Sequence, residues 1–175
     1  MMPLDGVFWL LLTVFGVMGA LRGWAKEILV SFSVIVALFL RLVFSKYVPF
    51  AESFLTRMPA IEQFYVYGIL VIVMAVVGYA GPVVSARLAG KAVREKLQDV
   101  LLGAILGAFN GYLIIGTLWY FLHAANYGIL DIQPPAYGST AEILASEYLI
   151  LAWLSDPALL TIVAFAFVFV LIVFL

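Results

Sequence analysis

The sequence predicts an all-α integral membrane protein with about five transmembrane helices and additional interfacial amphipathic helices. Hydrophobic residues make up 66% of the 175 residues and charged residues only 11%, whereas a soluble domain is nearer half apolar and a quarter charged. The apolar residues gather in five runs, each close to the roughly 20 residues that a helix needs to cross a bilayer. Because a bilayer offers no water to unpaired backbone groups, we expect each run to be a helix.

The five apolar runs give the expected order of the spans. The N-terminal segment MMPLDG has an acidic residue and no Lys or Arg, so we expect the first run to be retained as a span rather than removed as a signal peptide. The runs cover residues 4–21, 28–44, 64–81, 100–123 and 157–175.

The chain divides into three parts by composition. Residues 1–123 are expected to form a four-span membrane core, and 157–175 the fifth transmembrane helix. Between them, 124–156 is predicted to be an acidic extracytoplasmic loop with an amphipathic helix. Ser139 followed by Glu142 has the spacing of a capping box, which predicts where that helix begins.

The Lys and Arg residues of the loops predict the orientation. Arg22 and Lys26 lie between the first two runs, and Arg87, Lys91 and Arg94 lie between the third and fourth. The loop before the fifth run has no Lys or Arg. Short loops rich in these residues stay cytoplasmic, so we expect the N-terminus outside and the C-terminus inside. The second loop weighs against this orientation with three basic residues, Arg41, Lys46 and Arg57.

A tight charged turn is expected between the first two spans. Gly23 permits a sharp bend after Arg22, and Glu27 begins the next helix, where its charge suits the helix dipole. We therefore predict a turn ion pair between Arg22 and Glu27. The alternative is that the basic residues here only anchor the topology.

Residues 83–100 are expected to form a basic amphipathic helix. Arg87, Lys91 and Arg94 recur at three- and four-residue spacing and so share one face. Such a face is predicted to contact anionic lipid headgroups, although docking to a cytoplasmic partner is an alternative. Asp99 is expected to cap the fourth span.

Small residues line one side of the first and fourth spans. A small-residue strip lets two membrane helices approach closely, so we predict that these two spans pack together. The alternative is the generally high glycine content of membrane helices. The helix-packing residues are expected to be Gly16, Gly19 and Gly23 with Gly103, Gly107 and Gly111.

The sequence offers no sign of catalysis. It has no cysteine and a single histidine, His123, so neither thiolate chemistry nor a histidine zinc cluster is expected. Phosphate-binding glycine loops and nucleophile elbows are also missing from the sequence. We therefore expect no enzyme activity, no catalytic residue, no metal and no cofactor. The net charge of −1 indicates no nucleic-acid partner, so lipids, other membrane proteins or further copies of the chain are the expected partners.

Two blocks of residues resemble one known family. The first block comprises Leu4-Asp5, then Arg22-Gly23 and Glu27. The second comprises Asp99, Leu102-Gly103, Gly107 and Gly111. In this order and on these spans, they resemble the colicin V production protein family, CvpA, over about residues 4–123. Asn110 departs from the pattern, because the family often has Arg just before the last glycine.

The resemblance implies a protein of the bacterial cytoplasmic membrane. Members of this family are associated with the production or export of a peptide toxin and with envelope maintenance. The first expected function is therefore a non-enzymatic factor that works through helix contacts with partners. An accessory subunit of a larger respiratory, photosynthetic or translocation complex is an alternative. A homo-oligomeric channel that uses the glycine faces is a second.

Overall fold

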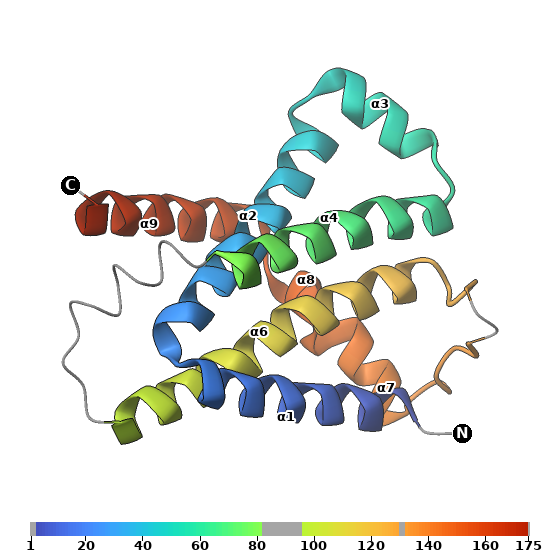
Figure 1. The fold of residues 1–175 in the computed structure, drawn as a ribbon. Coiled ribbons are helices and arrows are strands. Elements are labelled where there is room, and N and C mark those ends of the chain that lie inside the picture. Colours follow the sequence, from blue (N-terminus) through green and yellow to red (C-terminus); the bar gives the residue numbers. More distant parts are fainter. Residues whose placement is uncertain (1–2, 82–95, 130–131, 175) are drawn as a thin grey trace.

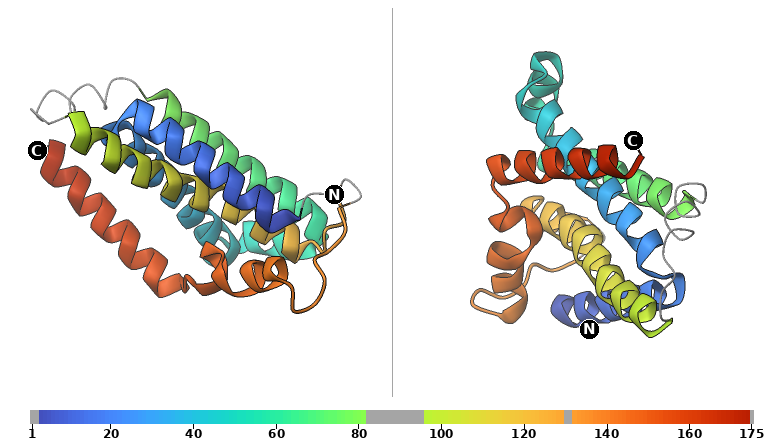
Figure 2. Two further views of the ribbon diagram at one scale, coloured as in Figure 1. Left: turned by 90° about the horizontal axis from the view of Figure 1, so that it is seen from below. Right: turned by 90° about the vertical axis from the view of Figure 1, so that its left-hand side faces the viewer.

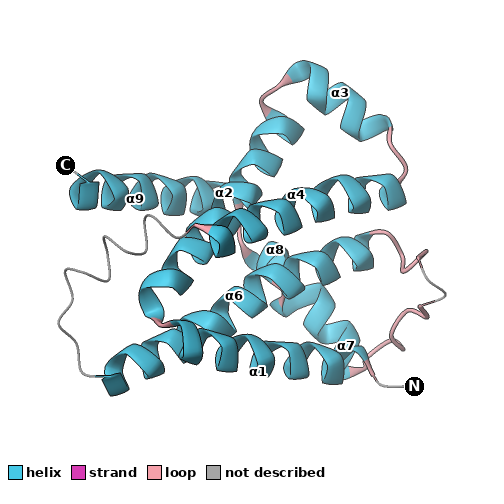
Figure 3. Ribbon diagram, viewed as in Figure 1, coloured by secondary structure: helices cyan, strands magenta, loops and turns pink. Residues whose placement is uncertain are grey.

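The apolar runs form long helices in the computed structural model, which describes residues 3–81, 96–129 and 132–174. Figure 1 shows their arrangement, and Figure 3 shows that helices and loops account for the described residues. The long helices are α1 (Leu4–Arg22), α2 (Trp24–Lys46), α4 (Ala60–Ala80), α6 (Lys96–Ala124) and α9 (Asp156–Phe174). The short helices are α3 (Pro49–Arg57), α7 (Thr140–Ile143), the π-helix η1 (Leu144–Tyr148) and α8 (Ile150–Trp153).

Four helices among the described residues are long and apolar enough to cross a membrane. They are α1, α2, α4 and residues Leu97–Ala124 of α6. The predicted all-α membrane fold is therefore confirmed. In α9 the side chains are described over Asp156–Val168, which is shorter than a bilayer crossing. The fifth span accordingly stays a prediction.

Helix α6 lies at the centre of the bundle and α1 packs along its length (Figures 1 and 2). Phe8 near the start of α1 contacts Trp119 near the end of α6, with ring centroids 5.4 Å apart. At the other end of the pair, Gly19 lies against Gly103. The two helices are therefore antiparallel. This agrees with the two long apolar helices, α2 and α4, that lie between them in the chain.

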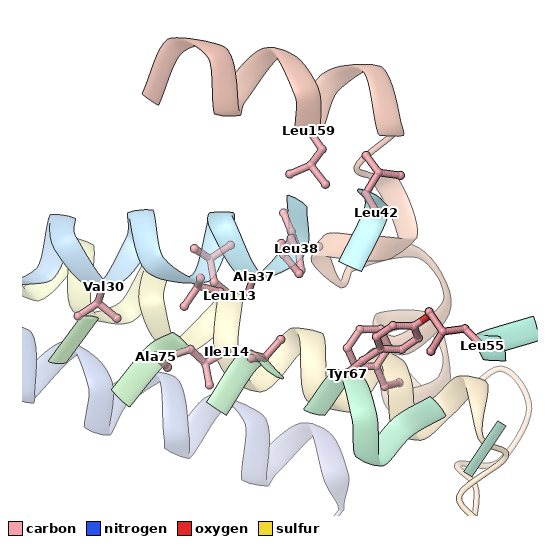
Figure 4. Packing of buried hydrophobic residues seen from close by; sticks show 14 residues of the cluster. Val30, Ala37, Leu38, Leu42, Leu55, Tyr67, Ala75, Leu113, Ile114 and Leu159 are labelled. Carbon is pink, nitrogen blue, oxygen red and sulfur yellow. The ribbon is translucent and has the colours of Figure 1, made fainter. Parts of the chain in front are cut away.

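The core lies between α2, α4 and α6 (Figure 4). Val30, Val34 and Leu38 recur every four residues on α2, so they share one face, and each is at most 1% exposed. This face packs against buried residues of α4 and α6 such as Val71 and Leu113. Large apolar side chains on the outer faces stay exposed in the isolated chain, as expected for helices whose solvent is lipid.

Arg41 belongs to α2 rather than to a loop. Its guanidinium lies 5.3 Å from the ring centre of Tyr67 on α4 and 5.4 Å from that of Phe121 on α6. Cation–π contacts of this kind hold a cation against aromatic faces. Arg41 thus packs between helices. It therefore counts less as a loop charge when the membrane orientation is predicted from the Lys and Arg residues of the loops.

The segment before α9 is more broken than a single amphipathic helix. Ser139 Oγ accepts the Glu142 N–H at 3.3 Å, so the expected start of a helix is present. The helix then passes into η1 and stops at Leu149, whose backbone is extended. Tyr112 of α6 explains the break, because its hydroxyl donates to the Tyr148 carbonyl at 2.6 Å and accepts from Trp153 Nε1 at 2.8 Å. The segment therefore folds back onto α6.

Candidate functional site: a buried polar cluster

A polar cluster lies inside the apolar bundle, near the turn between α1 and α2. Glu27 and Asn110 are 0% exposed and Ser31 is 6% exposed. Arg22 reaches them from the end of α1 with its side chain 28% exposed. Burying polar groups in an apolar bundle costs free energy unless the groups are paired. The hydrogen bonds and ion pair of the cluster therefore determine whether it stabilises the fold.

Gly23 makes the turn that brings the cluster together. Gly23 has a φ of 84° and a ψ of 153°, which is not a helical conformation. Helix α1 therefore ends at Arg22, and α2 begins at Trp24. A side chain is disfavoured there because of the positive φ, and an added Cβ would lie 2.8 Å from an oxygen of Asp99. The helices can therefore turn within one residue only because that residue is glycine.

Asp99 contributes to the start of α2. It lies in the first turn of the described part of α6, and its Oδ1 accepts the backbone N–H of Trp24 at 3.2 Å. The residues just before α6 lie outside the described part of the chain, so the cap of the fourth span stays a prediction. Since the first N–H groups of a helix have no partner within it, a carboxylate from α6 satisfies one at the start of α2.

Arg22 and Glu27 lie within salt-bridge distance across this turn. Arg22 Nε donates to Glu27 Oε1 at 2.9 Å. The same guanidinium lies over the Tyr79 ring of α4, 4.5 Å from its centre, and its Nη2 donates to the Tyr79 carbonyl at 3.4 Å. Arg22 thus compensates a fully buried carboxylate while its own charge is held by an aromatic face and a carbonyl.

Asn110 holds the second oxygen of the carboxylate. Its Nδ2 donates to Glu27 Oε2 and to the Glu27 carbonyl, each at 2.9 Å. Ser31 Oγ in turn donates to Asn110 Oδ1 at 2.7 Å. An amide suits this position because it donates and accepts at once. An Arg here, as the family pattern often has, would instead bring a second cation to Glu27.

Ser31 is not among the site residues expected from the sequence, and Asn110 stands out there only as a departure from the family pattern. One signal was available, because Ser31 lies four residues after Glu27 and so shares its helix face. The contact with Asn110 bridges 79 residues of sequence. Spacing along a single helix therefore could not reveal it.

The glycine residues of α1 and α6 bring two backbones into contact. A Cβ added to Gly19 would lie 2.7 Å from the Gly107 Cα, and one added to Gly107 would lie 2.8 Å from the Gly19 Cα. A Cβ on Gly103 would overlap the backbone of Gly19. Side chains do not fit at these three positions, so the helices meet backbone to backbone.

The other predicted packing glycines lie at the margins of this contact. A Cβ on Gly111 would lie 2.8 Å from the Phe15 Cβ, whereas one on Gly16 would lie 3.5 Å from the Ala104 carbonyl, an ordinary distance. Gly23 faces Asp99 and serves the turn. The predicted lipid-facing residues lie outside the described part of the chain, namely Arg87, Lys91 and Arg94.

The hydrogen bonds of the cluster connect residues from different helices. Both oxygens of Glu27 accept hydrogen bonds from protein groups. Within the described residues, no three His, Cys, Asp or Glu side chains gather as metal ligands. The contacts of Glu27 and Arg22 join α1, α2, α4 and α6 at one point, which makes the cluster a polar clamp on the four-helix core.

Comparison with known proteins places this core in a family. The sequence model of the colicin V production protein family matches residues 4–131. This range contains α1 to α6 and both blocks of motif residues. No match was found among curated proteins or among solved structures. Since the match covers well over half of the chain, this membrane protein belongs to the colicin V production protein family.

Proposed function

We propose that this chain is a non-enzymatic protein of the bacterial cytoplasmic membrane that supports peptide-toxin production or secretion, or envelope homeostasis. It acts through helix contacts with partner membrane proteins. Membership of the colicin V production protein family supports the process. The close packing of α1 on α6 and the hydrogen bonds between helices support the mode of action, because such a bundle can present defined outer faces to its neighbours.

The observation that carries the contact proposal is a groove on the outer side of the α1–α6 pair. It has a volume of about 480 Å³ and opens widely to the surroundings. Small residues form much of its lining, which lets a partner helix approach closely where lipid gains less. These small residues are Gly16, Ala20, Ala104 and Ala108.

A complementation experiment tests this proposal. In a bacterium that exports a colicin V-type toxin and lacks this gene, the parent chain should restore secretion. Ala104→Leu with Ala108→Leu should lower secretion several-fold at equal membrane level, because the added side chains fill the groove. Val73→Leu with Val76→Leu is the matched control on exposed positions of α4. Equal secretion by the groove variant and the control would contradict the contact proposal.

The orientation proposal follows the basic residues. The end of the bundle with Arg22 and Lys26 faces the cytoplasm, with the N-terminus outside and the C-terminus inside. Cysteines at Lys26 and Glu142 should label from opposite sides of the membrane. Labelling from one side only would overturn this topology.

The alternatives are separated by two measurements. An accessory subunit should co-migrate with a defined complex when the untagged chain is purified in its native state. A channel should give conductance in liposomes. The side chains of Glu27, Ser31 and Asn110 are bonded to one another within one chain, so this cluster does not favour a polar pore lining between copies.

A further inference from the structure

A second groove lies between α2, α4 and α9, away from the α1–α6 pair. Its volume is about 470 Å³, and it opens sideways along the N-terminal half of α2. Its lining is apolar apart from Ser33, whose hydroxyl is turned to the Leu29 carbonyl at 3.0 Å. The groove is lined by Leu29, Phe32, Ser33, Ile35 and Val36 of α2, Val77 and Gly81 at the end of α4, and Val163, Ala166 and Phe167 of α9.

Helix α9 closes one end of this groove and leaves the other open. Asp156 at its start pairs with Lys46 at the end of α2, and Leu159 one turn later is 3% exposed in the core. Farther along, Phe167 is 63% exposed. Helix α9 is therefore packed into the core near its start and is more exposed farther along.

Lys26 lies one turn before the first α2 residue that lines the groove. Lys26 lies three residues before Leu29 and seven before Ser33, so the three side chains share one face of α2. Lys26 is exposed, and across residues 3–81, 96–129 and 132–174 no carboxylate lies within salt-bridge distance of its ammonium. The N-terminus of α2 adds the positive end of the helix dipole at the same place.

We propose that this groove binds an anionic phospholipid of the bilayer, with one acyl chain along α2 and the phosphate at the Lys26 ammonium. The arrangement joins an apolar groove to a cation that has no carboxylate partner among the described residues. A phospholipid offers the complementary groups, an acyl chain and an anionic phosphate. A docked helix from a second copy would match the apolar lining but would leave Lys26 without an anion. This proposal is independent of the partner groove on α1 and α6.

A lipid titration of the purified full-length chain tests the proposal. Thermal unfolding in neutral detergent is followed while dioleoylphosphatidylglycerol or dioleoylphosphatidylcholine is added. We expect the anionic lipid to raise the melting temperature more than the zwitterionic lipid. Lys26→Gln should weaken the apparent affinity for phosphatidylglycerol about fivefold, the value of one Lys–phosphate contact at a membrane surface. Arg57→Gln, which removes an exposed cation elsewhere, should leave it unchanged.

A second pair of variants tests the acyl-chain part. Val36→Trp places a large side chain into the groove and should reduce the stabilisation by phosphatidylglycerol at least as much as Lys26→Gln. Val76→Trp is the control, because Val76 is exposed on α4 outside the groove lining. The proposal is overturned if Lys26→Gln and Val36→Trp respond to both lipids as the parent does. It is also overturned if Val36→Trp abolishes a dimer in native mass spectrometry while added lipid has no effect, since a second copy would then occupy the groove.

Discussion

Two regions of the molecule each have helix packing beside one ion pair: the α1–α6 seam, where Gly19, Gly103 and Gly107 meet, and the α2–α9 junction, where Lys46 pairs with Asp156. They differ in how closely the helices pack and in how far the ion pair is buried. At the seam, two backbones meet through Gly19, Gly103 and Gly107, and the Arg22–Glu27 pair beside it is largely buried. At the junction, α9 leaves an open groove, and both side chains of the Lys46–Asp156 pair are substantially exposed, at 57% and 41%. The comparison indicates that burial, rather than the number of ion pairs, decides which contacts hold this fold.

The largest expected effect is that of Arg22→Ala. The change leaves the carboxylate of Glu27 buried without its cation, which should cost roughly 3–5 kcal/mol of unfolding free energy. The measurement is denaturant unfolding in mixed micelles, together with the amount of protein in the membrane. Lys26→Ala is the control, because this neighbouring cation is exposed and has no ion-pair partner among residues 3–81, 96–129 and 132–174. A similar loss in both variants would reduce the role of Arg22 to anchoring the topology.

The next largest effect is expected at the glycine seam. Gly107→Ala adds a Cβ that would lie 2.8 Å from the Gly19 Cα, so α1 and α6 must move apart. Overpacking of this kind typically costs about 1–3 kcal/mol. Gly116→Ala on the same helix is the matched control, since its Cβ would lie 3.6 Å from a Leu149 methyl group. If both variants unfold at the same denaturant concentration, the seam is not closely packed.

The smallest effect is expected at the α2–α9 junction. Lys46→Ala removes an exposed ion pair, so the unfolding free energy should fall by no more than about 1 kcal/mol. The same denaturant titration measures it, and its salt dependence should also be weak once the pair is gone. A loss as large as that of Arg22→Ala would mean that exposure does not separate the two regions.

Much of the fold could be read from the sequence, because bilayer thickness constrains the length of each helix. The expected runs 4–21 and 28–44 correspond to α1 and α2, and the charged turn falls between them as expected. Helix α3 and the break at Leu149 were not expected. The break depends on the Tyr112 hydroxyl, which competes for the Tyr148 carbonyl from another helix, and local sequence does not carry that contact.

The site was predictable where its partners lie close in sequence. Arg22 and Glu27 are five residues apart, and the glycine between them indicates the bend. Asn110 and Asp99 lie on α6, and their contacts with Glu27 and Trp24 depend on how α6 packs against the turn. The four-residue glycine spacing predicted which faces meet, but not which backbone groups the polar side chains of α6 would then reach.

A double-mutant cycle on Arg22 and Glu27 tests the central claim that Arg22 compensates a carboxylate buried in the helix bundle. Unfolding free energies are compared for the parent, Arg22→Ala, Glu27→Gln and the double variant. Because the cost of Arg22→Ala arises from the uncompensated charge, removing that charge should recover much of it, and the double variant should lose less than the sum of the single losses by at least about 1.5 kcal/mol. Additive losses would contradict the claim, since the two side chains would then act independently.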